Sequence, residues 1–395
     1  MSNKWEIYPE NEKQIEDLKD KYNISKLLAT ILVNRNLVKK ERIEKFLTPT
    51  RNDFYDPFLM PDMKLAVNRI LKAIKNNEKI IIYGDYDADG ITSVTVLKSF
   101  FEDRKIDVDT YIPNRLNEGY GLNMEAIKKI IDNQYTLMIT VDCGITGKKE
   151  IDYANLHGVD TIVTDHHEVG EELPKAIAVI DTKREDSKYP FRELAGVGVA
   201  FKLIHALSKV LELDEKEYLK YLDIVCIGTI SDIVPLVDEN RVIAKLGLML
   251  IKQTKNLGLK SMIQSSGYKK IDSTTISFGI APRINACGRM GFAEKALELF
   301  LSKDIIEVKD LTEQLNQYNQ KRQAIEKEIF ENAKEQIEKE NISNKNTIVV
   351  CGKNWHHGVI GIVSSKITEM YFKPSILLGF DGEEAKGSRK KYSRF

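Results

Sequence analysis

Three aspartates at alternate positions follow an apolar run near residue 80. The stretch IIIYGDYDADG places Asp85, Asp87 and Asp89 directly after the residues of a buried strand pattern. Two carboxylates about 4 Å apart repel each other by roughly 1 kcal/mol in water and by roughly 4 kcal/mol at an effective dielectric of 20. Either a bound cation or open solvent must offset this repulsion.

Further acidic and imidazole residues stand where other apolar runs end. They are Asp142 after residues 136–141, the group Asp165, His166 and His167 after residues 160–164, and Asp232 in ISDIVPL. Ligand sites in an open parallel sheet form at the carboxyl ends of its strands. If the runs are strands of one sheet, these side chains share one of its edges, and this shared position favours a ligand site over a solvated turn.

The mixture of carboxylates and imidazoles suits a divalent cation. Mn²⁺ and Mg²⁺ fit a set rich in aspartate better than Zn²⁺, which prefers Cys and His. Four or more carboxylates with one or two imidazoles exceed what one ion needs. A pair of ions about 3.5–4 Å apart, the arrangement used for phosphoester hydrolysis, accounts for the whole set.

The spacing D-x-D-x-D-G also opens the calcium loop of the EF-hand. The twelfth position of that loop is a bidentate Glu, whereas here it is Val96. EF-hand loops follow a helix, whereas residues 79–83 form a short β-branched run bounded by Gly84, which indicates a strand. Both differences argue against a calcium loop.

Strand and helix patterns alternate from about residue 63 to residue 182. The apolar runs are 79–83, 106–112, 136–141, 160–164 and 176–180, with helical patterns between them. This alternation predicts an α/β fold with a doubly wound parallel sheet and right-handed crossovers. Residues 197–264 are predicted to be mainly helical.

The chain divides into four predicted parts. They are a helical lead-in at 1–62, a catalytic domain at 63–303, a connecting helix at 304–340 and an incomplete second α/β domain at 341–395. The apolar stripe of the long helix drifts from a spacing of 3.5 toward 4 residues, which favours a helix between domains over a coiled coil. The last part is expected to supply two strands and one helix, which leaves an open sheet edge and a poorly stabilised segment. A premature stop, a frameshift or a trimmed chain is expected to account for this short end.

The composition is that of an ordinary globular protein. The 59 basic and 59 acidic residues cancel, so any nucleic-acid surface must be a local patch. Four cysteines lie far apart without a CxxC pair, which fits a reducing cytoplasm and argues against a disulfide framework. No apolar run approaches the ~18 residues of a membrane span, and the polar start has no signal-peptide core. We therefore expect a cytoplasmic protein without membrane contact.

The ordered motifs resemble a known family. DADG, VDCG, DHH and SDIVPL follow one another as in the DHH phosphoesterase superfamily. Within it, IIIYGDYDADGITS, GVGVAFKL, IAPRINACGRM and WHHGVIGIVSSKI are similar to the RecJ family of single-strand-specific 5′→3′ DNA exonucleases. The resemblance covers nearly the whole chain. It implies a role in DNA repair and recombination, with single-stranded DNA as substrate and 5′-mononucleotides as products.

The resemblance also implies roles for individual residues. The implied metal ligands are Asp87, Asp89, Asp142, His166 and Asp232. Asp142 would bridge two Mn²⁺ or Mg²⁺ ions, and His167 would face the scissile phosphate. Asp85 and Asp165 would orient the ligands or bind metal themselves. Many DHH relatives carry a His four residues before the first ligand, where this chain has Tyr83, which implies fewer protein ligands for one ion.

Two further segments are expected to contact phosphate. Arg283 and Arg289, with Asn285 between them, lie in APRINACGRM, and Arg offers a planar fork that matches phosphate oxygens. Arg283 is also expected to neutralise charge at the reacting phosphate. The family places His356 and His357 in a loop of an accessory (DHHA1) domain, before a helix whose start grips nucleic-acid phosphate.

Other functions stay open at this stage. Gly196 and Gly198 form half of a dinucleotide fingerprint, but Phe201 takes the place of the third glycine, so we expect no nicotinamide cofactor. A DHH phosphodiesterase for cyclic dinucleotides or nanoRNA is one alternative, against which the chain length and the segment 283–289 argue. A non-catalytic nucleic-acid-binding relative is the other, and the retained ligand residues argue against it. A single-strand-binding protein and a helicase are the protein partners that the resemblance suggests.

Overall fold

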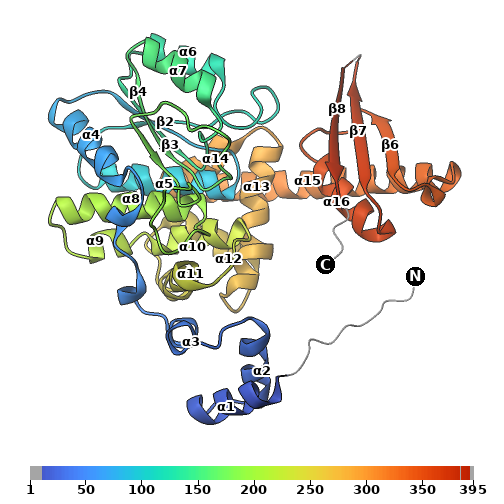
Figure 1. Ribbon diagram of the computed structural model, residues 1–395. Helices are drawn as coiled ribbons and strands as arrows, with labels where there is room; N and C mark the ends of the chain where they lie inside the picture. The colour runs from blue at the N-terminus through green and yellow to red at the C-terminus, as the bar shows by residue number, and fades with distance from the viewer. Residues whose placement is uncertain (1–10, 383, 392–395) are drawn as a thin grey trace.

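Five parallel strands form the main sheet of the protein. The computed structural model describes residues 11–382 and 384–391, and within them the strand order is β2-β1-β3-β4-β5 (Figure 1). The strands are β1 (Ile80–Tyr83), β2 (Asp109–Tyr111), β3 (Leu137–Val141), β4 (Asp160–Thr164) and β5 (Ala178–Ile180). Each lies within an apolar run predicted to be a strand, and all pairings are parallel, so the predicted sheet is confirmed.

Helices cover both faces of this sheet, as the buried Ile- and Val-rich strands require. On one face lie α4 (Met63–Lys75), α5 (Ala88–Glu102) and α8 (Gly196–Val210). On the other lie α6 (Met124–Asp132) and α7 (Lys148–Leu156). Successive residues of β1 alternate between these layers, since Ile80 and Ile82 join the first core and Ile81 and Tyr83 the second. The doubly wound arrangement is thereby confirmed.

A further group of helices packs against α5 and α8. Its helices are α9 (Lys216–Leu219), α10 (Leu222–Ser231), α11 (Asp238–Ile251), α12 (Leu257–Ser266), the π-helical η3 (Thr275–Ile280), α13 (Ala281–Arg289) and α14 (Ala293–Leu301). The group packs there through α10 and α14. All residues of α10 from Leu222 to Ile230 are buried, as expected for a helix that is apolar on every side. This burial fixes its C-terminal end, which is followed by Asp232.

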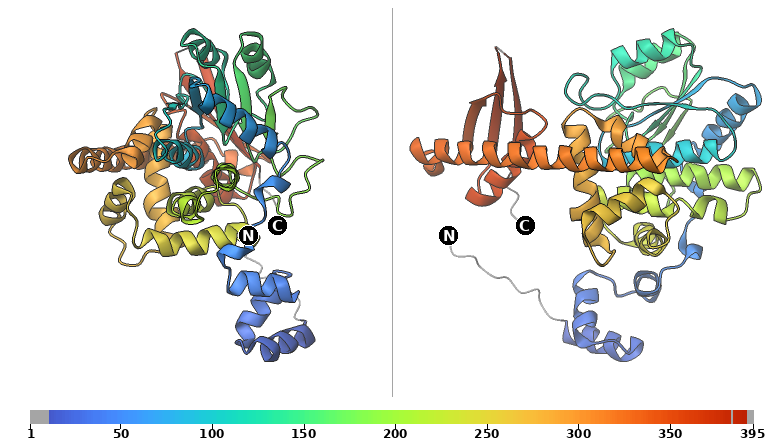
Figure 2. Two further views of the ribbon diagram at one scale, coloured as in Figure 1. Left: turned by 90° about the vertical axis from the view of Figure 1, so that its left-hand side faces the viewer. Right: turned by 180° about the vertical axis from the view of Figure 1, so that it is seen from behind.

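The long helix α15 (Ile305–Lys339) joins two hydrophobic cores (Figure 2). Its first half packs on the core of the main sheet through Leu311 and Leu315. Its second half packs on a separate core through Ile329 and Ile337. One helix therefore holds the C-terminal sheet at a fixed side of the main body.

The C-terminal sheet has three strands within the described residues. They are β6 (Ile348–Lys353), β7 (Ser375–Asp381) and β8 (Glu384–Lys390), with α16 (Ile360–Tyr371) packed against them. The prediction of only two strands was wrong, because β8 pairs antiparallel with the whole length of β7. The sequence of this strand, EAKGSRK, has almost no apolar residues, so it lacks the apolar pattern from which a strand is predicted. Its charged composition is typical of an edge strand.

Three short helices precede the main body. They are α1 (Glu12–Tyr22), α2 (Lys26–Asn34) and α3 (Lys40–Leu47), and they enclose a small core of their own. The 3₁₀ turns η1 (Arg51–Asp53) and η2 (Pro57–Leu59) lead from them to α4, and η4 (Ile342–Asn344) follows α15. Residues 1–10 of the predicted lead-in and 392–395 of the last part lie outside the described residues. Across the described part of the chain, every helix is too short or too polar to cross a bilayer.

Candidate metal centre

Seven predicted site residues meet at the carboxyl edge of the main sheet. They form three overlapping groups whose ligand atoms lie within 4.8 Å of one another: Asp85, Asp87 and Asp142; Asp89, His166 and Asp232; and Asp142, His166 and His167. We call these residues together the ligand cluster. Its members follow β1, β3 and β4, and Asp232 follows the helix α10. The expectation that strand ends gather these side chains therefore agrees with the structure for the residues after the three strands, whereas a helix end supplies Asp232.

Asp142 lies at the centre of the cluster. Its backbone is left-handed, with φ of 59°, which short polar residues tolerate better than most. Its Oδ1 atom lies 3.1 Å from Nε2 of His166. Within the described residues neither atom has a hydrogen-bond partner. Buried polar atoms are rarely left unpaired, so two of them facing each other fit a cation bound between them.

The charges of the cluster also fit divalent cations. Burial and the neighbouring Asp87 raise the pKa of both Asp85 and Asp89 to about 7. Burial and Asp89 raise the pKa of Asp232 to about 7. Burial lowers the pKa of His166, which keeps its imidazole neutral, the form that binds metals. Carboxylates that repel one another and a neutral imidazole make a suitable ligand set for Mn²⁺ or Mg²⁺.

The backbone holds the carboxylate of Asp87 in the first loop. Oδ1 of Asp87 accepts hydrogen bonds from the N–H groups of Asp89 at 2.8 Å and Gly90 at 3.1 Å, which caps α5. Asn285 accepts a further bond from the N–H of Ala88 at 2.9 Å. Asn285 thus supports this loop with its carbonyl oxygen.

Asp165 supports the cluster without joining it. Its Oδ1 accepts hydrogen bonds from the N–H of His166 at 2.7 Å and of His167 at 3.2 Å, and lies 2.7 Å from Nδ1 of His167. Its Oδ2 accepts one from the N–H of Ile145 at 2.9 Å. Since both oxygens are engaged, Asp165 has the geometry of an orienting residue. Asp85, for which both an orienting and a metal-binding role were expected, lies within a ligand group, and its Oδ1 is unpaired in the described chain.

His167 stands at the open side of the cluster, with 43% of its side chain exposed. The hydrogen bond to Asp165 raises the pKa of His167. On its other side, Nε2 lies 3.1 Å from the hydroxyl of Tyr120. A protonated His167 can therefore face a ligand that reaches the cluster from solvent.

Tyr83 supplies no metal ligand here. It is fully buried in β1, and its hydroxyl donates a hydrogen bond to the carbonyl of Gly121 at 3.0 Å. The ring stacks on Tyr111 of the neighbouring strand. Its position therefore agrees with an ion held by fewer protein ligands.

The structure separates the two arginines of the 283–289 segment. Nε of Arg283 donates to Oδ1 of Asn316 on α15 at 2.6 Å, and its Nη1 donates to the carbonyl of Gly279. Arg289 lies on a different face of α13 from Arg283, and its guanidinium interacts electrostatically with Asp87. Burial, with Arg115 close by, lowers the pKa of Arg289 to about 10. Arg283 therefore ties α13 to α15, and the expectation that it faces the reacting phosphate finds no support in its contacts.

The loop with the two histidines lies beside Arg289. Nη1 of Arg289 donates to the carbonyl of Gly358 at 3.1 Å. Nδ1 of His356 accepts from the N–H of Gly358 at 3.1 Å, and Nε2 of His357 lies 3.1 Å from the carbonyl of Gly379. The C-terminal part of the chain thus reaches the side of the metal centre at this loop.

Two neighbours of the cluster escaped the sequence analysis. Tyr120 and Arg115 lie in the loop between β2 and α6, and the guanidinium of Arg115 stands 4.8 Å from the ring centre of Tyr86. This loop also begins at a strand end. Only acidic and imidazole residues at strand ends were predicted to belong to the site, so this arginine and this tyrosine were not predicted.

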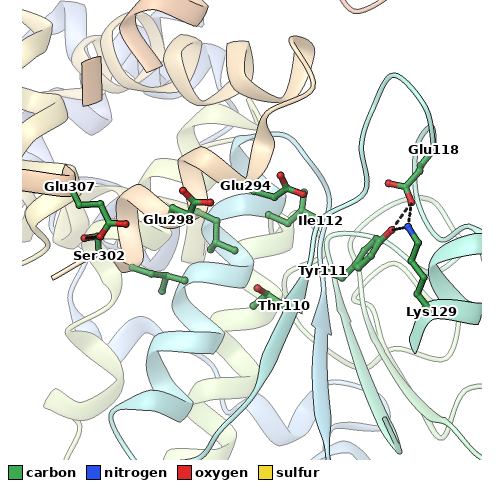
Figure 3. A pocket seen from close by; sticks show the side chains of 11 residues that line it. Thr110, Tyr111, Ile112, Glu118, Lys129, Glu294, Glu298, Ser302 and Glu307 are labelled. Atoms are coloured by element: carbon green, nitrogen blue, oxygen red, sulfur yellow. Dashed lines mark hydrogen bonds and ion pairs between the residues drawn. The ribbon is translucent and has the colours of Figure 1, made fainter. Parts of the chain in front are cut away.

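A cavity of about 650 Å³ lies at the edge strand β2, beside α14 (Figure 3). Glutamates dominate its charged lining: Glu118, Glu294, Glu298 and Glu307. The hydroxyl of Tyr111 donates to Glu118 at 2.5 Å, and Lys129 lies 3.9 Å from the same carboxylate. An acidic lining repels phosphate, so this cavity is not a path for nucleic acid.

Comparisons with known proteins agree with this geometry. Residues 79–229 match the DHH family, N-terminal domain. The chain is 43% identical to the single-stranded-DNA-specific exonuclease RecJ of Bacillus subtilis, over 99% of this chain and 50% of that protein. It is 36% identical to the protein of that name from Thermus thermophilus, over 83% of this chain and 48% of that protein. The chain spans about half the length of these curated relatives.

Solved structures show the same relationship. A crystal structure of exonuclease RecJ bound to manganese superposes with a TM-score of 0.75 at 36% identity, and the match covers 81% of this chain and 80% of that one. RecJ from Thermus thermophilus in complex with Mn²⁺ superposes with a TM-score of 0.78 at 30% identity, over 93% and 52% of the two chains. The resemblance of the motifs is thereby confirmed, and the chain belongs to the RecJ family of DHH proteins.

Proposed function

We propose that this protein is a metal-dependent exonuclease that degrades single-stranded DNA from its 5′ end to 5′-mononucleotides. The observation that carries the proposal is the ligand cluster, whose facing atoms, Oδ1 of Asp142 and Nε2 of His166, are buried and have no hydrogen-bond partner within the described chain. The relatives are named as single-stranded-DNA-specific exonucleases, and this name supports the substrate.

The ligand cluster would hold two Mn²⁺ or Mg²⁺ ions. Asp85 and Asp87 would hold one ion, and Asp89, His166 and Asp232 the other, with Asp142 shared between them. When bound, such a pair activates water and stabilises the attacking and leaving oxygens of an in-line displacement. RecJ structures described with bound Mn²⁺ and Mg²⁺ support both metals.

His167 and Asp165 would act on the phosphate together. Asp165 accepts from the Nδ1–H of His167 and fixes the orientation of its ring. The protonated Nε2 of His167 then donates a hydrogen bond to a phosphoryl oxygen or to the leaving oxygen. Tyr120, whose hydroxyl is 3.1 Å from this nitrogen, holds the place that the phosphate oxygen would take.

The cationic side chains near Asp87 would bind the DNA backbone. Arg115 lies near Arg289, and Lys321 lies near His356. Arg322 is also near Arg289, but its guanidinium is engaged by Glu326 and Asn319. The loop at 356–358 meets α13 at Arg289. A local basic patch of this kind accounts for nucleic-acid binding by a chain whose net charge is zero.

Replacing Arg289 by Gln is expected to weaken single-strand binding for every base sequence. The log–log dependence of affinity on salt should flatten by about 0.7 for each lost phosphate contact. Arg283→Gln is the matched control, because Arg283 lies on the same helix but bonds Asn316 and Gly279. Fluorescence anisotropy over a salt series, without divalent metal, measures both. A flatter salt dependence for Arg283→Gln and not for Arg289→Gln would reverse the assignment.

The parts of the chain have separate roles in this proposal. Residues 63–303 carry the chemistry, the helix at 304–340 joins them to residues 341–395, and these contribute the loop beside Arg289. Residues 1–62 form a lead-in. A single-strand-binding protein and a helicase remain predicted partners.

Oligonucleotides labelled at one end test the proposed function. With Mn²⁺, a 5′-labelled single strand should release its label as a mononucleotide from the start, whereas a 3′-labelled strand should shorten stepwise. A duplex should resist, and chelation of the metal should stop the reaction. Hydrolysis of dinucleotides alone would indicate a small-substrate phosphodiesterase, and binding without hydrolysis a non-catalytic relative; either result would refute the proposal.

A further inference from the structure

We infer that Gly196 and Gly228 are positioning residues of the metal centre. The missing Cβ atom at each glycine lets a helix lie directly against the carboxylates of the ligand cluster. This inference rests on the proposed function for the identity of the metal. It gives the motif GVGVAFKL a role that a dinucleotide fingerprint does not explain.

Gly196 begins α8 and binds Asp89 through its backbone. Its N–H donates to Oδ2 of Asp89 at 2.7 Å, and the N–H of Val197 donates to Oδ1 at 2.8 Å. The start of a helix carries a partial positive charge that favours a carboxylate. The first turn of α8 therefore fixes both oxygens of Asp89, a member of the Asp89–His166–Asp232 group.

The same glycine lies against Asp142. A Cβ atom at position 196 would stand 2.5 Å from Oδ1, 2.6 Å from Cβ and 2.7 Å from Cγ of Asp142. Contacts this short require movement, and rotating the carboxylate cannot relieve the clash with the Cβ atom. Either Asp142 withdraws from His166, or α8 withdraws and loses its two hydrogen bonds to Asp89. Both outcomes displace a carboxylate of the cluster.

Gly228 provides the corresponding contact on α10. A Cβ atom there would stand 2.3 Å from Oγ1 of Thr92, 2.7 Å from Cγ1 of Val197 and 2.9 Å from Oδ1 of Asp89. The carbonyl of Gly228 accepts from the N–H of Asp232 at 2.9 Å. A side chain at this position would push α10 away from α5 and α8 and carry Asp232 with it.

Gly198 offers a matched control on the same helix. A Cβ atom at this buried position would meet only the side chain of Leu194 within 3.4 Å, at 3.3 Å from Cδ2. Alanine favours a helix interior over glycine, so the replacement by alanine has a favourable local term at Gly198 and at Gly228. A difference between Gly196→Ala and Gly198→Ala then reports the contact with the carboxylates.

A calorimetric titration of the metal-free protein with Mn²⁺ alone tests the inference. Thermal melts establish that each variant is folded. Gly196→Ala and Gly228→Ala should each raise the Kd for Mn²⁺ by at least about tenfold, the scale found when groups that orient metal ligands are lost. Gly198→Ala should bind as the unmodified protein does. Should Gly196→Ala fail to fold, Gly228→Ala decides by the same criterion.

Unchanged Mn²⁺ affinity in the folded variants would overturn the inference, and so would an equal loss in Gly198→Ala. The result is separable from the proposed function. An unmodified protein that binds Mn²⁺ but does not degrade single strands would refute the function alone. An active protein whose Gly196→Ala and Gly228→Ala variants keep full Mn²⁺ affinity would refute the inference alone.

Discussion

Replacing Asp142 by Asn is expected to lower the turnover of single-stranded DNA by at least about 10³-fold, which corresponds to about 4 kcal/mol of transition-state stabilisation. Asp142 belongs to two of the three ligand groups, and its Oδ1 faces Nε2 of His166 at 3.1 Å. Loss of its charge therefore disturbs both metal positions at once. Initial rates at saturating Mn²⁺ measure the effect.

Asp223→Asn is the control for this experiment. Asp223 is also a buried carboxylate and lies on α10, but at the opposite end of this helix from Asp232. Its Oδ2 accepts a hydrogen bond from the hydroxyl of Thr254 at 2.6 Å. Asp85→Asn should cost less than Asp142→Asn, since Asp85 belongs to a single group. Equal losses for Asp142 and Asp223 would contradict the assignment of the metal centre.

Replacing His167 by Gln is expected to lower turnover by about 10²–10³-fold, within the range for a lost proton donor. The affinity for Mn²⁺ should change much less than in His166→Gln, because Nδ1 of His167 is engaged by Asp165 and its other nitrogen faces solvent and Tyr120. Single-turnover rates and Mn²⁺ titrations together separate the two effects.

Tyr120→Phe controls for the surroundings of His167. It removes the hydroxyl next to Nε2 and keeps the ring that packs edge-on against the imidazole. Its rate should stay close to that of the unmodified protein. If His167→Gln instead loses Mn²⁺ affinity as completely as His166→Gln, His167 is a metal ligand and not a proton donor.

The main sheet and most of the cluster could be predicted because two local rules apply there. Buried parallel strands are continuous apolar runs, and every predicted run contains a strand. Ligand sites form at the carboxyl ends of such strands. This rule alone predicted that Asp142 and His166 lie close to Asp89. Both signals lie in consecutive residues.

The separate positions of the two arginines could not be predicted from their proximity in the sequence. Arg283 and Arg289 are close in the sequence and were expected to act together. The segment is the helix α13, and six residues at 3.6 per turn place the two side chains about 120° apart around the axis. Only the packing of α13 against α15 decides which of them lies beside the cluster.

Long-range contacts also explain the other differences. β8 has a charged sequence and becomes a strand through its pairing with β7. Gly196 looked like half of a nucleotide-binding motif, and its contact with Asp142 joins residues that are distant in the chain. Asp85 lies in a ligand group because its side chain faces Asp142, which its spacing from Asp87 does not reveal.

The number of Mn²⁺ ions bound by each chain tests the central claim most directly. Electron paramagnetic resonance and calorimetry on metal-free protein should find two ions per chain, with spin coupling expected of ions about 3.5–4 Å apart. Asp142→Asn should abolish the coupling. A single uncoupled ion at saturation, with nuclease activity intact, would contradict the two-metal centre.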